Sequence, residues 1–375
     1  MKVSSLLLAL LIVPAGAGAQ TTVVPFQPGL TASGITYYLP STTLRFVVTA
    51  TRTTHTPGPY ATYAERFLDI HDAPLTTFDE WTLDDISLVA YGTPDVSQGY
   101  SIALNPKSLA PLVTLTADGI LLAVNDETAL PSPLPRASVI QLASTTAKPD
   151  EFLTPEILRA TSMVKKAELA AQEIYDIREN RSLIAKGLAD FNPTDGTQLQ
   201  LMLSELDRSE RGIMQQFIGT TQSARYTFTF DVTPQPSDPS SERTPQHTTL
   251  FRFSRHLGVV DADDLAGEPF TLTVTDETTL PAPVIDPKTK KPVDPSSSKS
   301  KVSQDLRYRV PGRARISIEG NGAEHLSAIS PIAQFGRVEH LGGELFKAGK
   351  VNTKVQLNAV TGNIEHITTE PVMNK

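Results

Sequence analysis

The chain has 375 residues, of which 39% are hydrophobic and 20% charged, and its formal net charge is −8. This length suits two or three domains, and the composition excludes both a wholly disordered chain and a polytopic membrane protein. The acidic balance disfavours nucleic-acid binding. The absence of cysteine excludes thiol nucleophiles, thiolate zinc sites, iron–sulfur clusters and disulfides, so we expect packing alone to hold the fold.

Residues 1–19 have the pattern of a cleavable secretory signal peptide. Lys2 supplies a positive start, Leu6–Val13 an apolar run, and Ala17-Gly18-Ala19 a small-residue cleavage site before Gln20. The apolar run is too short for a membrane anchor, and no cysteine is present to carry a lipid. We therefore expect a soluble, exported protein of the periplasm or cell surface, which is not a lipoprotein and has no transmembrane segment after cleavage.

Residues 20–150 are expected to form a first β lobe with mainly antiparallel strands. Leu44–Ala50 is rich in β-branched and aromatic residues and precedes the turn-forming Thr56-Pro57-Gly58-Pro59. The strongest hairpin signal is Ala117-Asp118-Gly119, which lies between two apolar runs. Gly92-Thr93-Pro94-Asp95 predicts a further turn between two strands, whereas Tyr60–Ile70 fits either a strand or a helix.

Residues 151–223 predict an antiparallel helical hairpin with arms of about 30 and 23 residues. Thr154 can cap the first helix, with Pro155 at its first position, and Asp195 can cap the second. Each helix carries one apolar stripe, and the alanines of the first stripe imply a close approach of the second helix. The two stripes are Ile157, Ala160, Val164, Ala167, Ala171 and Ile174, and Leu199, Met202, Leu206, Ile213 and Phe217.

Residues 224–375 are expected to form a second β lobe. Tyr226–Val232 alternates strictly between large and smaller polar residues, which predicts a strand with one buried face. Phe228–Thr233, which precedes a proline-rich stretch, resembles Leu44–Thr49, which precedes another, and duplication of one β module stands beside chance as the explanation. The stretches 234–247 and 281–305 are rich in proline, serine and charge and predict extended, mobile loops; the lysines of the second leave open a basic docking tail.

The predicted fold class is α+β, with two mainly antiparallel β lobes joined by a long antiparallel helical hairpin. The common catalytic and phosphate-binding motifs are absent from the sequence, and we expect no cofactor. No two histidines stand at ligand spacing on a helix. A metal cluster assembled by the fold is left open for His325, His340 and His366.

Four short sequence segments carry a resemblance to a known family. They are Gly34–Pro40, Tyr63–Leu68, Ser108–Leu112 and Tyr308–Ala314. In these segments the chain resembles an uncharacterised family of exported bacterial proteins, a domain of unknown function. The resemblance covers nearly the whole mature chain. It implies export and an organisation shared over the full length, and it brings no activity, cofactor or site residue.

The favoured hypothesis is a non-enzymatic envelope protein that binds another envelope protein or helps to assemble a surface complex. Its basis is the absence of catalytic motifs together with a long hairpin and long loops, which suit contact with a partner. The candidate partner-binding residues are polar positions expected on the outer faces of the hairpin: Lys165, Lys166, Glu173, Arg208 and Glu210.

The alternative hypothesis is a carbohydrate-binding or carbohydrate-processing protein, with a glycan as its partner. Trp81 is the candidate sugar-stacking residue, because an aromatic face packs well against a sugar ring. Four tyrosines would extend that face, although filling of the core or surface of a β lobe explains the aromatic residues better. Five carboxylates would offer a glycosidase pair, whose separation in space the sequence does not show. These residues are Tyr37, Tyr38, Tyr60 and Tyr63, and Glu65, Asp79, Glu80, Asp84 and Asp85.

Overall fold

The computed structural model describes residues 22–25, 34–103, 112–142, 149–189, 195–236, 244–279, 305–342 and 351–371. The predicted signal peptide, residues 1–19, lies outside this part of the chain, as do 237–243 and 281–304 of the two predicted loops. Antiparallel strands form three sheets, and two long helices contact each other. The predicted α+β class is thus confirmed.

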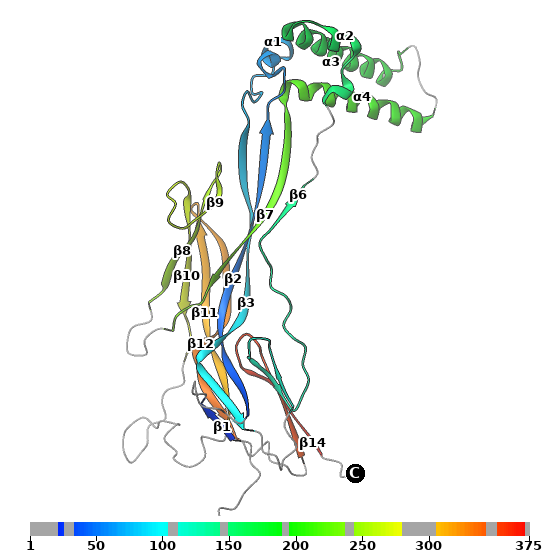
Figure 1. Cartoon of the computed structure of the whole chain (residues 1–375). Coiled ribbons are helices and arrows are strands. Elements are labelled where there is room, and N and C mark those ends of the chain that lie inside the picture. Colours follow the sequence, from blue (N-terminus) through cyan, green and yellow to red (C-terminus); the bar gives the residue numbers. More distant parts are fainter. Residues whose placement is uncertain are drawn as a thin grey trace, which may run out of the picture.

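Sheet A runs along most of an elongated molecule (Figure 1). Its strand order is β1-β3-β2-β7-β6. These strands are β1 (Thr22–Pro25), β2 (Gly34–Thr56), β3 (Phe78–Ala103), β6 (Ser138–Gln141) and β7 (Thr220–Val232).

The turn predicted at Gly92-Thr93-Pro94-Asp95 is wrong, because β3 continues through it. Pro94 lies opposite Pro40 of β2, beside a register shift between Tyr38 and Pro40. A local irregularity of this kind admits proline into a strand without ending it. The long antiparallel pairing with β2 therefore overrides the local turn preference.

Sheet C packs face to face with sheet A. Its order is β12-β11-β10-β8-β9, and its strands are β8 (Gln246–Ser254), β9 (Gly258–Val260), β10 (Glu268–Asp276), β11 (Leu306–Gly320) and β12 (Ala323–Leu341). The alternating apolar residues of both sheets interdigitate as in a sandwich. The buried core between them comprises Leu44, Phe46, Val48, Ile86, Leu250, Phe251, Phe270, Leu272, Val274, Ala314, Ile316, Ile318, Ile332 and Phe335.

Sheet B has four shorter strands in the order β14-β13-β5-β4. They are β4 (Val113–Leu115), β5 (Leu121–Val124), β13 (Val351–Leu357) and β14 (Ile364–Pro371). A separate core joins this sheet to sheets A and C, and it comprises Tyr37, Leu39, Ile102, Leu121, Val124, Leu306, Val355 and Leu357. Sheets A and B each combine strands from before and after the helices.

The helices gather at one end of the long sheet (Figure 1). We call this region the helical head, and it comprises the 3-10 turns η1 (Ala61–Tyr63) and η2 (Pro149–Phe152) with the helices α1 (Ala64–Leu68), α2 (Pro155–Arg159), α3 (Met163–Ala185) and α4 (Gly196–Ile218). The ambiguous stretch Tyr60–Ile70 is therefore helical. Among the described residues, no helix combines the length and the apolar character that a membrane crossing requires.

The first arm of the predicted hairpin is two helices, not one of about 30 residues. Thr154 does cap α2, where its side chain accepts a hydrogen bond from the Ile157 amide. Ala160 then leaves helical geometry with ψ of 136°, and Ser162 caps α3 by accepting from the Lys165 amide. The chain therefore bends at residues 160–162. Asp195 caps α4 as predicted.

The head has its own buried core. Close packing is visible at Gly212 of α4, where an added Cβ would lie 2.1 Å from the Phe152 ring. The core comprises Tyr60, Ala64, Leu68, Ile157, Ala167, Ala170, Ala171, Ile174, Ile177, Ile213 and Phe217. None of these residues belongs to the cores of the three sheets.

Candidate functional site

A groove crosses the outside of the head between α2 and α3, and two of the predicted partner-binding residues line it. Lys165 and Glu173 lie on α3 on either side of Leu169. The Lys165 ammonium pairs with Glu168 at 3.2 Å. The groove has a volume of about 720 Å³, and its lining comprises Thr154, Pro155, Glu156, Arg159, Ala160, Lys165, Leu169 and Glu173.

Large apolar side chains are exposed beside the bend between α2 and α3. Leu158, Met163 and Val164 have exposed fractions of 50%, 45% and 38%. Val164 was expected in the buried stripe, but it lies in the first turn of α3, and the head core begins on this helix at Ala167. Lys166 is partly buried on the same helix. The groove thus combines charged walls with an apolar border.

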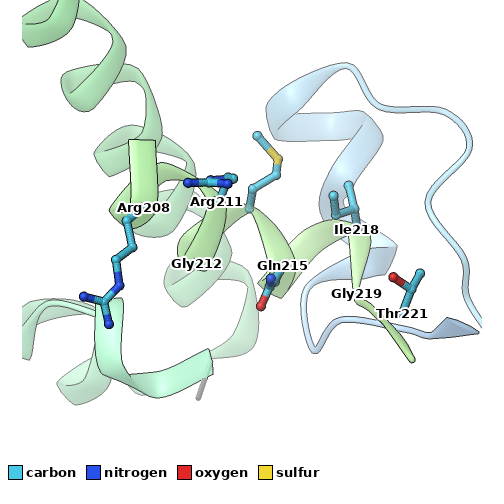
Figure 2. A pocket seen from close by; sticks show the side chains of 8 residues that line it. Arg208, Arg211, Gly212, Gln215, Ile218, Gly219 and Thr221 are labelled. Carbon is cyan, nitrogen blue, oxygen red and sulfur yellow. The ribbon is translucent and has the colours of Figure 1, made fainter. Parts of the chain in front are cut away.

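Arg208 lies on α4 at a second groove of about 460 Å³ (Figure 2). Its guanidinium lies 3.5 Å from Glu151 and stacks over the Phe152 ring at 5.5 Å. Arg211, Met214 and Ile218 line the same groove towards the end of the helix. Arg208 is therefore exposed, as expected, but it does not share the groove of Lys165.

Glu210 does not lie on the outer face of the hairpin, which corrects the sequence-based expectation. Its carboxylate accepts a hydrogen bond from Arg178 at 2.6 Å and pairs with Arg181 at 3.0 Å, both on α3. The signal was present in the sequence, because Glu210 falls between Leu206 and Ile213 at the spacing of the buried stripe. Glu210 therefore joins the two long helices.

Trp81 lies on β3, packed against neighbouring strands. Its ring centroid is 4.8 Å from that of Tyr226, and an added Cβ at Gly258 would lie 2.6 Å from its ring. The tyrosines do not gather around it, because Tyr37 is buried in the core that joins the three sheets and Tyr60 in that of the head. Sugar stacking at Trp81 stays a prediction.

The carboxylates near Trp81 are engaged with basic or hydroxyl side chains. Asp79 lies 3.8 Å from Arg52, and the Thr51 hydroxyl donates to Asp84 at 2.6 Å. The guanidinium of Arg255 lowers the pKa of the Glu80 carboxyl. This direction is opposite to the raised pKa of a glycosidase general acid.

The three histidines left open as a metal site do not come together. His325 and His340 stand at opposite ends of β12, about 50 Å apart at roughly 3.3 Å per residue. His325 interacts with the Gly320 carbonyl and His340 with Arg307. The described part of the chain contains no group of three or more histidine, aspartate or glutamate side chains placed to hold a metal. The metal-cluster alternative is therefore wrong for these residues.

A cavity of about 560 Å³ lies beneath a proline-rich segment, and its lining contains none of the predicted site residues. We call residues 130–137 the strap. The cavity lies between the strap, β3, the β4–β5 turn and the turn after β13. The lining comprises Val89, Ala90, Tyr91, Gly92, Thr93, Thr116, Ala117, Asp118, Ile120, Leu130, Pro131, Ser132, Pro133, Leu134, Ala359 and Val360.

Arg45 of β2 ties the strap to sheet A. Its guanidinium donates to both carboxylate oxygens of Asp231, at 2.8 and 2.6 Å, and to the Pro135 carbonyl at 2.9 Å. It also lies over the Tyr91 ring at 5.2 Å. The hydrogen bond from Arg45 lowers the pKa of Asp231, whereas burial raises that of Tyr91. The sequence analysis did not predict the strap, although a proline stands at every second position from 131 to 135.

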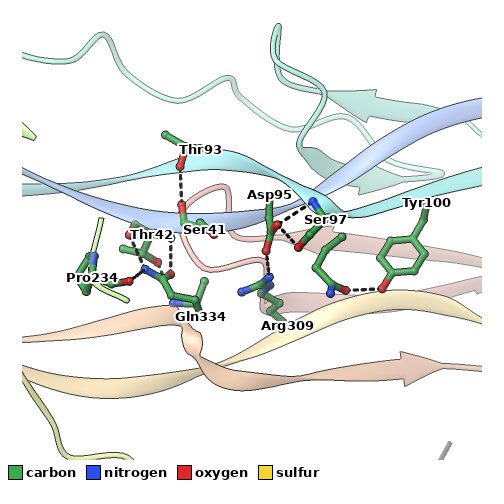
Figure 3. Close-up of polar contacts among 11 residues, drawn as sticks. Ser41, Thr42, Thr93, Asp95, Ser97, Tyr100, Pro234, Arg309 and Gln334 are labelled. Carbon is green, nitrogen blue, oxygen red and sulfur yellow. Dashed lines mark hydrogen bonds and ion pairs between the residues drawn. The ribbon is translucent and has the colours of Figure 1, made fainter. Parts of the chain in front are cut away.

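A polar network joins β2 to β12 and β3 to β11 near the cavity (Figure 3). The Gln334 amide group accepts from the Thr42 amide at 2.8 Å and donates to the carbonyls of Thr42 and Pro234 at 3.0 and 2.8 Å. Further along, the buried Arg309 guanidinium pairs with Asp95. All of these contacts are internal, so the network fixes the sheets relative to one another.

A search of curated proteins and a search of solved structures find no match to this chain. A comparison with protein-family models matches residues 33–365 to a domain of unknown function, DUF4831. The match covers nearly the whole chain and carries no activity with it. This match agrees with the resemblance of the four segments and establishes that the chain belongs to the DUF4831 family.

Proposed function

We propose that this protein is an exported, non-enzymatic binding protein that contacts another envelope protein through the groove between α2 and α3. The observation that carries the proposal is the pattern of side chains along that groove. Lys165, Leu169 and Glu173 follow one another at intervals of four residues. They place a cation, an apolar side chain and an anion on one face, over about 12 Å of helix.

This pattern favours a helix as the part of the partner that binds. An antiparallel helix that carries, from its N-terminus, a base, an apolar residue and an acid at the same spacing would match each position in charge and polarity. Arg159 and Glu156 on α2 give the opposite wall a charge of each sign. The exposed Leu158 and Met163 at the border would bury their apolar surface against the same partner.

The position of the head supports the proposal as well. It projects at one end of the elongated molecule (Figure 1), where a partner can approach without contacting the sheets. Export rests on the sequence of residues 1–19, and N-terminal sequencing of the mature protein is expected to begin at Gln20. An intact Met1 in exported material would contradict export by cleavage.

Site-specific photocrosslinking in the native envelope tests the interface. A photoreactive residue at Ala160, inside the groove, is expected to give one discrete crosslinked species. The same residue at the exposed Ile367 of β14 should not give that species. Exchange of the two charges, Lys165→Glu with Glu173→Lys, should abolish the crosslink and leave the melting temperature unchanged.

A matched control is available far from the head. Lys354 of β13 pairs with Glu370 of β14 at 2.7 Å, and exchanging these charges alters the same residue types with no change in net charge. This control should preserve the crosslink at Ala160. If the exchange at Lys165 and Glu173 leaves the crosslink intact, the groove is not the interface.

A further inference from the structure

The cavity beneath the strap has the size and lining of a site for a small organic ligand. Its volume of about 560 Å³ falls within the range of about 300 to 1,000 Å³ that is usual for such sites. Most of the lining residues are valine, isoleucine, leucine, proline or alanine. We propose that this cavity binds an apolar molecule that carries an ammonium group, with the Asp118 carboxylate as its counter-ion.

The polar side chains of the lining determine the chemistry of the ligand, because most of them already have partners. Thr93 donates to the Ser41 carbonyl at 3.2 Å, and the Thr116 hydroxyl accepts from the Ile120 amide at 3.0 Å. Tyr91 interacts with Asp231 and Arg45. Asp118 is the one charged residue of the lining, and it has no ion-pair partner among the described residues.

The same contacts indicate the sign of the ligand's charge. Neither Arg45 nor Arg136 of the strap lines the cavity. The Arg45 guanidinium is occupied by Asp231 and by the Pro135 carbonyl. An anionic ligand would therefore meet the uncompensated carboxylate of Asp118. A cationic ligand gains an ion pair at the rim and buries its apolar part against the strap.

The walls are held in place from several sides. Arg45 fixes the strap at Pro135, and β6 pairs with β7 just beyond it. At the base, an added Cβ at Gly92 would lie 2.0 Å from the Ala359 carbonyl, so β3 and the turn after β13 are in close contact. A cavity with such walls is largely formed before a ligand arrives, which lowers the entropic cost of binding.

Three probes of equal chain length test the proposal. Octylamine, octan-1-ol and octanoate are titrated into the full chain at pH 7 and followed by isothermal titration calorimetry. Octylamine is expected to bind about five- to tenfold more tightly than octan-1-ol, as a partly exposed ion pair allows. Octanoate should bind more weakly than either.

Two variants locate the binding. Asp118→Asn removes the charge and leaves Asn-Gly, a pair that favours tight hairpin turns, so the fold should persist. It should reduce the affinity for octylamine to that for octan-1-ol. Ala117→Trp places a large ring at a lining position and should weaken all three probes. Glu127→Gln, at an exposed carboxyl that does not line the cavity, is the matched control.

These titrations test the cavity proposal independently of the proposed role of the helical head. A preference for octylamine that disappears in Asp118→Asn and persists in Glu127→Gln supports it. Equal affinity for the three probes overturns it, as does octylamine binding that neither variant alters. Absence of octylamine binding up to millimolar concentrations overturns it as well.

Discussion

At the scale of single residues, Gln334 makes contacts usually made by a neighbouring strand. Thr42 is fully buried, and both its amide and its carbonyl pair with the side chain of Gln334 (Figure 3). The Thr42 hydroxyl in turn accepts from the Ala333 amide at 2.9 Å and donates to the Val360 carbonyl at 3.1 Å. One glutamine and one threonine thereby join sheets A, B and C.

Replacing Gln334 by alanine should therefore be strongly destabilising. The change leaves the buried backbone groups of Thr42 unpaired, which we expect to cost about 2 to 3 kcal/mol in the free energy of unfolding. Urea denaturation measures the difference. Gln222→Ala, at an exposed position of β7, should change stability by less than about 0.5 kcal/mol. Equal effects of the two changes would show that the network contributes little.

The pair of Asp231 and Arg45 makes a prediction about pH. Arg45 lowers the pKa of Asp231 in the folded protein, so the carboxylate stabilises the fold above its unfolded pKa of about 4 and loses this effect as the pH falls through the folded value. The stability advantage of the wild type over Asp231→Asn should be complete at pH 7 and should shrink below about pH 4. Urea unfolding at both pH values measures it. Asp263→Asn, at an exposed carboxyl, should show no such dependence.

At the scale of elements, the local signals were the ones that sequence could predict. The Ala117-Asp118-Gly119 turn forms between β4 and β5, and Gly119 adopts a φ of +86°, which glycine tolerates without strain. Caps at Thr154 and Asp195 are also found. The bend before Ser162 was missed because the apolar stripe continues across it, so the helical period outweighed a capping residue that was present in the sequence.

Ala167 of α3 provides a test of packing in the head. Its side chain is fully buried within the head core, and a phenylalanine there would overpack the space between the helices. We expect Ala167→Phe to cost about 1 to 3 kcal/mol in the free energy of unfolding, measured by urea denaturation with helical circular dichroism. Glu179→Ala, at an exposed position of the same helix, should be nearly neutral. A neutral effect of phenylalanine would contradict the close packing.

At the scale of the whole molecule, the decisive contacts join distant parts of the sequence. Leu44 of β2 lies opposite Val232 of β7, and Phe46 opposite Phe230. The two strands are similar in sequence. Their adjacency in one sheet gives a physical reason for this similarity, because neighbouring strands of a sheet face the same surroundings on each side. Such pairings cannot be read from local patterns, because any alternating strand could pair with any other. For the same reason the sequence did not reveal the strap cavity.

The separate core of the head leads to a prediction about the cooperativity of unfolding. The residues that pack the head are distinct from those that pack the sheets, so the head should open as a unit of its own, as regions with independent cores do. The head is not one consecutive segment of the chain, because its core includes Tyr60, Ala64 and Leu68 as well as residues of α2, α3 and α4. Native-state hydrogen exchange under conditions of rapid reclosing reports the opening free energy of each region separately.

Ala167→Phe and Gln334→Ala should then affect opposite parts of the protein. The first should speed amide exchange in α3 and α4 by about 5- to 150-fold, which corresponds to about 1 to 3 kcal/mol, and leave β2 and β11 unchanged. The second should speed exchange in β2 and β11 and leave α3 and α4 unchanged, because no bond of Gln334 reaches the head. If either variant speeds exchange equally in all four elements, the head and the sheets unfold together. Contact between a partner and the head would then stabilise the whole molecule instead of the head alone.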